Sequence, residues 1–209
     1  MGAVPQPFGS IPTQALANFN FNEFATGEGI VSFYGYTSYE SNSSSGALTS
    51  NASAYSNDLY TQAPQAMNFD TSAFNSPVLL KGTATYYLPT SITTAQTGSY
   101  SINLIRANSD GTLTTITTSS GGQLVSAGQA YKVVVMRAFP PETKINVGDK
   151  IRVQITTIGA SDMYLGHDPA DRDTGAAGAT PFGDDAIASI NGRTGTKMII
   201  QLPFKVDLS

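Results

Sequence analysis

The residue of this 209-residue chain best suited to chemistry is His167, its sole histidine. Histidine titrates near neutral pH and acts in many hydrolases as the base that activates a serine. No G-x-S-x-G nucleophile elbow accompanies it, and it stands in the turn sequence Gly-His-Asp-Pro rather than on a rigid element. We therefore interpret His167 as a solvated or turn-satisfying residue and not as a catalytic base.

Aspartates gather around this histidine. Four of them crowd into one segment, namely Asp162, Asp168, Asp171 and Asp173. Calcium takes six to eight oxygen ligands, which closely spaced carboxylates on a loop can supply. The spacing fits neither the EF-hand nor the nonapeptide calcium repeat, and Arg172 could instead neutralise part of the cluster. A calcium site and a solvated acidic loop both stay open.

Other catalytic arrangements have no counterpart in the sequence. With no cysteine and one histidine, neither a zinc site nor a thiol nucleophile is available. Only four glutamates are present, and nothing places two carboxylates opposite each other as a glycosidase needs. We expect no catalytic residue and no cofactor besides the calcium candidate, that is, a protein that is not an enzyme.

The charge and the hydropathy of the chain argue against two classes of partner, nucleic acids and membranes. Charged residues make up 12% of the chain, about half the usual share, and the 11 lysines and arginines are scattered singly. With a net charge of −4 there is no basic patch for nucleic acid. No apolar run approaches the ~18 residues of a membrane span, and residues 1–10 lack the pattern of a signal peptide. We expect neither a nucleic-acid nor a membrane partner.

Short strands must position these residues. Apolar side chains alternate along residues 100–104, 151–155 and 198–204, and a period of two buries one face of a strand. Asn108–Gly111 is a turn signal, after which Thr112–Thr118 can return as a hairpin partner. No helical period is found. The sequence predicts an all-β fold, a single jelly-roll-type antiparallel β-sandwich.

Four further segments complete the predicted strands. Gly29–Tyr36 is rich in β-branched and aromatic residues. Ser41–Ser56 is polar and predicts a surface loop or a weak edge strand. Pro77–Leu88 predicts one strand with a bulge at Gly82. Tyr131–Ala138 gives the strongest strand pattern, and we expect its buried face to carry Tyr131, Val133 and Val135.

The chain divides into an arm and one domain. Residues 1–18 hold three prolines and predict an extended N-terminal arm, either a disordered terminus or a tether on a neighbouring subunit. Residues 19–209 form the sandwich domain, with a long loop at 166–195 that is the best candidate for an interaction loop. The predicted interface residues are Phe8, Ile11, Phe182, Ile187 and Ile190.

Between Gly82 and Asp168 the motifs GTATYYL, SINLIRANSDGTLTTI and NVGDKIRVQI follow one another. This stretch resembles the jelly-roll pattern of virion-associated and secreted β-sandwich domains, and GEGIVSFYGYTS is similar to the openings of tailed-virus structural proteins. The resemblance implies a non-enzymatic capsid-decorating or minor capsid protein located in the virion. Its expected partners are other capsid subunits, with a homo-oligomer such as a trimer.

Two alternatives stay open. A carbohydrate- or receptor-binding module would expose tyrosines such as Tyr34 and Tyr87 for stacking, although strand tyrosines also serve in cross-strand packing. A self-assembling extracellular filament or surface-layer subunit is the other alternative.

Overall fold

The computed structural model describes residues 28–37, 45–56, 60–62, 66–92, 94–125, 130–171 and 195–206. Every regular element among these residues is a β-strand, so the predicted all-β fold is confirmed. The same residues contain no helix that is long and apolar enough to cross a membrane. The N-terminal arm predicted at residues 1–18 lies outside the described residues.

The described strands follow one another along the chain. They are β1 (Glu28–Tyr36), β2 (Ser45–Thr49), β3 (Tyr60–Gln62), β4 (Met67–Asp70), β5 (Val78–Leu80), β6 (Ala84–Ile92), β7 (Thr97–Ala107), β8 (Leu113–Val125), β9 (Ala130–Ala138), β10 (Thr143–Ile145), β11 (Lys150–Ile158), β12 (Met163–Gly166) and β13 (Ile199–Val206).

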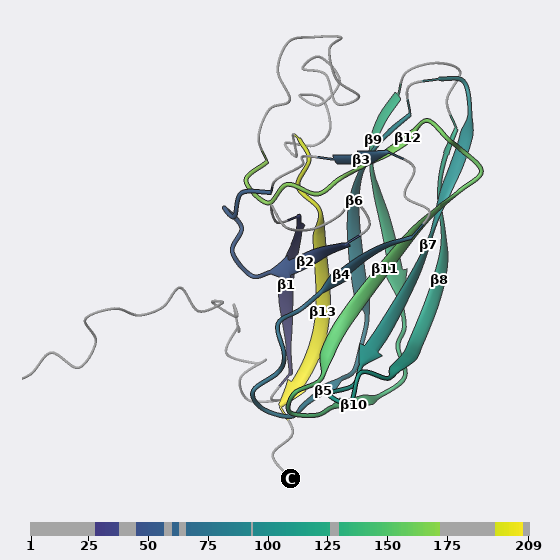
Figure 1. The fold of residues 1–209 in the computed structure, drawn as a ribbon. Helices are drawn as coiled ribbons and strands as arrows, with labels where there is room; N and C mark the ends of the chain where they lie inside the picture. Colours follow the sequence, from purple (N-terminus) through teal and green to yellow (C-terminus); the bar gives the residue numbers. More distant parts are fainter. Residues whose placement is uncertain are drawn as a thin grey trace, which may run out of the picture.

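The strands form two layers of an antiparallel sandwich. Hydrogen bonding runs in the order β3-β12-β6-β13-β1-β2-β4-β11-β7-β8, and β9 pairs with β6 as a branch. Among the described pairs, only β2 and β4 run parallel. In Figure 1 the layer of β4, β11, β7 and β8 lies across the layer of β1, β13, β6 and β9, and β2 links the two.

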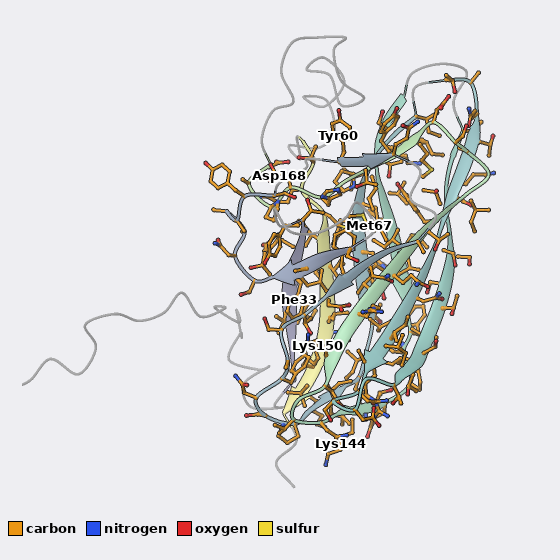
Figure 2. All side chains as sticks on the ribbon, in the orientation of Figure 1. Phe33, Tyr60, Met67, Lys144, Lys150 and Asp168 are labelled. Atoms are coloured by element: carbon orange, nitrogen blue, oxygen red, sulfur yellow. The ribbon has the colours of Figure 1, made fainter. Side chains whose placement is uncertain are left out.

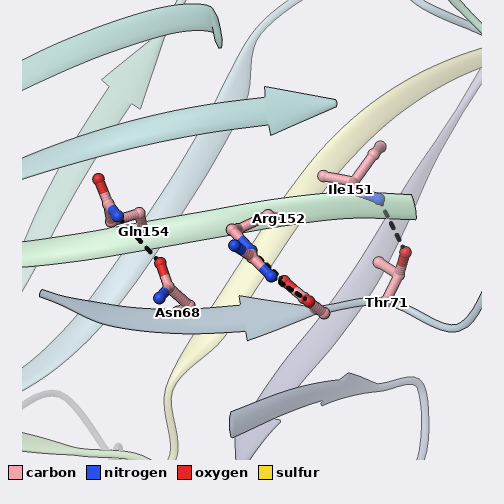
Figure 3. Close-up of polar contacts among 6 residues, drawn as sticks. Asn68, Thr71, Ile151, Arg152 and Gln154 are labelled. Atoms are coloured by element: carbon pink, nitrogen blue, oxygen red, sulfur yellow. Dashed lines mark hydrogen bonds and ion pairs between the residues drawn. The ribbon is translucent and has the colours of Figure 1, made fainter. Parts of the chain in front are cut away.

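Polar side chains join β4 to β11 on the outer side of the front layer (Figure 3). Arg152 makes a bidentate ion pair with Asp70, with Nε–Oδ1 and Nη2–Oδ2 distances of 2.7 and 2.8 Å. Beside it, the Gln154 side-chain amide donates to Asn68 Oδ1 at 3.0 Å. Because such a fork matches a carboxylate in two places, it fixes the register of the short strand β4.

In β11 and β13 the alternating apolar residues are buried, as the sequence analysis predicts. Ile151, Val153 and Ile155 of β11 are fully buried, as are Ile200 and Leu202 of β13. The turn at residues 108–111 is also confirmed, since the Gly111 amide donates to the Asn108 carbonyl at 2.9 Å.

The predicted buried face of β9 is wrong. Val134 and Met136 point into the core, whereas Val135 is 52% exposed. In the run YKVVVMRA both faces carry apolar side chains, so the period of two has no unique phase. Pairing with β6 decides the phase, because Val134 lies opposite the fully buried Leu88.

The predicted strand over residues 77–88 is two strands. The chain turns at Gly82, whose φ of +124° favours glycine, and β5 pairs with β10 and β13 instead of continuing into β6. The polar segment 41–56 contains β2, which lies between β1 and β4 and is no edge strand. Sequence analysis did not identify the short strands β3, β4 and β10.

Candidate functional site

An open groove of about 490 Å³ lies beside β1 and β13. One wall comes from Val31 and Phe33 of β1 with Phe204 of β13, and the other from Leu48 and the segment containing Phe74. In Figure 2 Phe33 marks this side of the sandwich, between Asp168 near one end and Lys144 at the other. The groove is lined mainly by apolar side chains, which is typical of small-molecule sites.

Three phenylalanines form the apolar centre of the groove. The Phe204 ring lies edge-on to Phe33, with centroids 6.5 Å apart, and tilts against Phe74 at 5.7 Å. Phe204 lies opposite Gly29 in the β1–β13 ladder, and a glycine has no side chain to cover the ring. The three rings are therefore packed against the core but only partly buried.

Polar groups occupy the margin of the groove. Lys205, Thr49, Ser50 and Asn75 all line it. The arrangement can therefore hold an apolar group against the phenylalanines, with the polar residues Thr49, Ser50 and Asn75 beside it.

A second polar group of residues surrounds His167. The imidazole Nε2 lies 2.8 Å from Thr61 Oγ1 of β3, and Nδ1 lies 3.5 Å from Ser56 Oγ. The Ser56 hydroxyl also lies 3.0 Å from Thr37 Oγ1, which follows β1. His167 is 0% exposed, so the interpretation of a solvated histidine is wrong.

Serine, histidine and aspartate meet here in one buried group of hydrogen bonds. Asp168 Oδ1 accepts the backbone N–H of Ser56 at 3.2 Å. Ser56 is 3% exposed, which leaves its hydroxyl without access to a substrate. The contacts instead join the ends of β1 and β12 to β3 and to the segment at residue 56.

Among the predicted calcium ligands, Asp168 and Asp171 stay close together, since the Asp171 amide donates to the Asp168 carbonyl at 3.0 Å, whereas Asp162 stands before the opposite end of β12. Asp162 Oδ2 accepts hydrogen bonds from Thr94 and Gln96, while Asp168 binds Ser56 as above. Asp171 Oδ1 accepts the Lys197 amide at 3.1 Å, and burial raises the pKa of this carboxyl. Asp173 lies outside the described residues.

No group of three or more His, Cys, Asp or Glu side chains that could hold a metal occurs within the described ranges. Calcium binding stays a prediction. The predicted loop at 166–195 has its first part packed, because residues 166–169 are buried. Phe8, Ile11, Phe182, Ile187 and Ile190, the predicted interface residues, all lie outside the described residues.

The tyrosines named in the sequence lie on different faces. Tyr86 is fully buried, whereas Tyr87 and Tyr34 flank Ile199 in one cross-strand row on the outer face. The Lys197 ammonium lies 5.9 Å from the centre of the Tyr34 ring. Sequence analysis missed the groove, because Phe74 stands in an irregular segment and nothing local marks it as a neighbour of β13.

No protein-family model matches the chain, and no curated protein matches it either. Similar folds do occur among solved structures. Two structures of a CocE/NonD family hydrolase from Staphylococcus aureus match 84% and 86% of this chain, with TM-scores of 0.52 and 0.53 and 11% identity. The chain spans 37% of that hydrolase's length. At this identity the likeness shows a shared fold.

These matches correct the predicted function. The fold that suggested a virion protein also occurs in a CocE/NonD family hydrolase. The prediction of a capsid-decorating or minor capsid protein is therefore wrong. The prediction that the chain is not an enzyme is contradicted by the same finding. The capsid prediction relied on a jelly-roll pattern that unrelated functions share, because a fold does not by itself imply a function. The prediction that the chain is not an enzyme relied on the absence of known catalytic motifs.

Proposed function

We propose that this chain supplies the β-sandwich part of a hydrolytic enzyme and that its groove binds the apolar acyl group of an ester or amide substrate. The groove beside β1 and β13, with its three partly exposed phenylalanines, is the observation that carries the proposal. The fold shared with a CocE/NonD family hydrolase supports the assignment to hydrolysis.

The size and lining of the groove favour an acyl chain of moderate length. Transfer of each methylene from water to an apolar site contributes about 0.8 kcal/mol, so the roughly five apolar carbons of a hexanoyl group gain about 4 kcal/mol. That gain corresponds to a dissociation constant of about 1 mM from apolar contacts alone. Contact with Phe33, Phe74 and Phe204 would supply it.

Binding of hexanoate to the full chain, followed by NMR chemical-shift titration, tests the proposal. We expect saturable shifts in β1 and β13, and a roughly tenfold weaker affinity in Phe74→Ala, since a truncated anchor costs on the order of 1–2 kcal/mol. Phe139→Ala is the matched control, because Phe139 is 73% exposed and does not line the groove. An unsaturable titration, or equal losses in both variants, would contradict the proposal.

Turnover of p-nitrophenyl hexanoate tests the hydrolytic part separately. Turnover that falls in Phe74→Ala but not in Phe139→Ala would place the reacting acyl group in the groove. Hexanoate binding without turnover would restrict the groove to a binding role within a larger enzyme. If the chain neither binds hexanoate nor turns over the ester, the proposal fails.

A further inference from the structure

Strand β8 forms an open edge of the sandwich. It is 13 residues long, from Leu113 to Val125, and among the described residues its ladder partner is β7 alone. Figure 1 shows β8 at the outer limit of the front layer. Strand β9 packs against one end of β8, where Val134 and Met136 lie next to Gly122, but it does not join the β8 ladder. The central residues 117–121 keep an outward row of backbone N–H and C=O groups that no strand within the described ranges pairs with.

The composition of β8 does nothing to prevent such pairing. Its sequence, LTTITTSSGGQLV, has no charged residue and no proline. Natural edge strands are usually short or bulged, or carry lysine, proline or an inward charge, because an unprotected edge recruits other strands. Strand β8 has two bulges but none of the other features, and its regular central stretch at residues 117–121 is typical of a strand that has a partner.

The exposed apolar residues of β8 are arranged symmetrically. Leu113 and Val125 are 55% and 66% exposed, and they stand six residues to either side of Ser119. In an antiparallel pair centred on Ser119, Leu113 would lie opposite the partner's Val125, and each would cover the other. Such self-complementarity is the property of a two-fold interface.

The irregularities of β8 follow the same symmetry. The register of β8 with β7 shifts twice. One shift leaves Ile116 without a residue opposite it in β7, and the other falls at Gly122–Gln123. These shifts stand about equally far from Ser119. The central residues 117–121 pair regularly with β7, which leaves a straight stretch for a second strand.

We propose that two copies of this chain associate through antiparallel pairing of β8 with β8, about a two-fold axis at Ser119. The sheet containing β7 and β11 then continues into the second copy, and Ser120 lies opposite the partner's Thr118. This inference is independent of the function proposed for the groove, which lies beside β1 and β13.

Strand β9, a further edge among the described strands, fits a second copy less well. Strand β9 pairs with β6 and carries Lys132 and Arg137, both with exposed side chains. Pairing two copies through β9 would bring cations close together, and like charges on opposing strands are destabilising. The uncharged edge of β8 has no such conflict.

Analytical ultracentrifugation of the full chain tests the dimer. We expect a species of twice the chain mass of 21.9 kDa. Thr118→Lys combined with Ser120→Lys puts lysines directly opposite each other across the axis, and we expect association to weaken by at least about tenfold. Ser53→Lys combined with Ser161→Lys is the matched control, since both serines are exposed and lie outside β8.

A charge-reversal experiment separates repulsion at the interface from damage to the fold. The double lysine variant and the matching Thr118→Glu, Ser120→Glu variant should each be monomeric alone and should form a mixed dimer when combined. Circular dichroism should show the same β spectrum throughout. A wild-type monomer at the highest soluble concentration, a dimer unaffected by both lysine pairs, or the absence of a mixed dimer would overturn the proposal.

Discussion

Two core tyrosines show how a single hydroxyl depends on its surroundings. Tyr86 and Tyr100 are both fully buried, and burial raises the pKa of each phenol, so both stay protonated. The Tyr100 hydroxyl lies 3.0 Å from Thr90 Oγ1. The Tyr86 hydroxyl has no hydrogen-bond partner within the described part of the chain. Buried hydroxyl groups without partners carry a desolvation cost that a phenylalanine avoids.

Replacing each tyrosine by phenylalanine should therefore have opposite effects on the free energy of unfolding. We expect Tyr86→Phe to leave stability unchanged or to raise it by up to about 1 kcal/mol, because an unsatisfied polar group is removed. Tyr100→Phe should cost about 1 kcal/mol through loss of its hydrogen bond. Urea denaturation measures both. Equal destabilisation by the two changes would show that the Tyr86 hydroxyl is satisfied in solution.

At the scale of elements, the crossing of β1, β2 and β4 depends on two glycines. A Cβ atom at Gly46 would lie 2.6 Å from the ring of Phe69 and 2.8 Å from the Tyr36 carbonyl oxygen. A Cβ atom at Gly35 would collide with the Met198 side chain and lie 3.1 Å from the same ring. Phe69 is fully buried, so the ring cannot move aside without disturbing the core.

Gly46→Ala should destabilise the fold by about 1–3 kcal/mol, the usual cost of overpacking a close-packed interior. Thermal unfolding followed by circular dichroism would measure the loss. Ala47→Ser, at the next position of β2, adds one atom without removing a glycine and serves as the comparison. A melting temperature unchanged by Gly46→Ala would contradict the close contact of β2 with Phe69.

At the scale of the whole molecule, side-chain hydrogen bonds hold together the end that carries His167. Carboxylates there already accept hydrogen bonds, as Asp162 does from Thr94 and Gln96 and Asp171 does from Lys197. A hard cation needs six to eight oxygens, and these donors would have to give up their partners.

We therefore expect the melting temperature to be the same in calcium and in excess chelator. Differential scanning calorimetry of the full chain makes the comparison. A ligand that binds the folded state at a hundred times its dissociation constant adds about 2.7 kcal/mol of stability, which would be plain in such a scan. A rise in calcium that Asp171→Asn removes would contradict this expectation and establish the site predicted from the sequence.

The sequence by itself determined the fold class and the core of several strands. Alternation at Ile151, Val153 and Ile155 has one possible phase, because polar residues separate them, and the structure buries all three. The absence of a helical period was equally plain. These features are local, since a period of two needs nothing beyond neighbouring residues.

Only the tertiary structure decided the features that depend on distant contacts. The phase of β9 followed from its pairing with β6, and the burial of His167 followed from contacts with Thr61 and Ser56, more than a hundred residues away. The groove likewise joins Phe33, Phe74 and Phe204 from three separate segments. No local pattern encodes such meetings, because loop closure and packing of the whole chain bring the residues together.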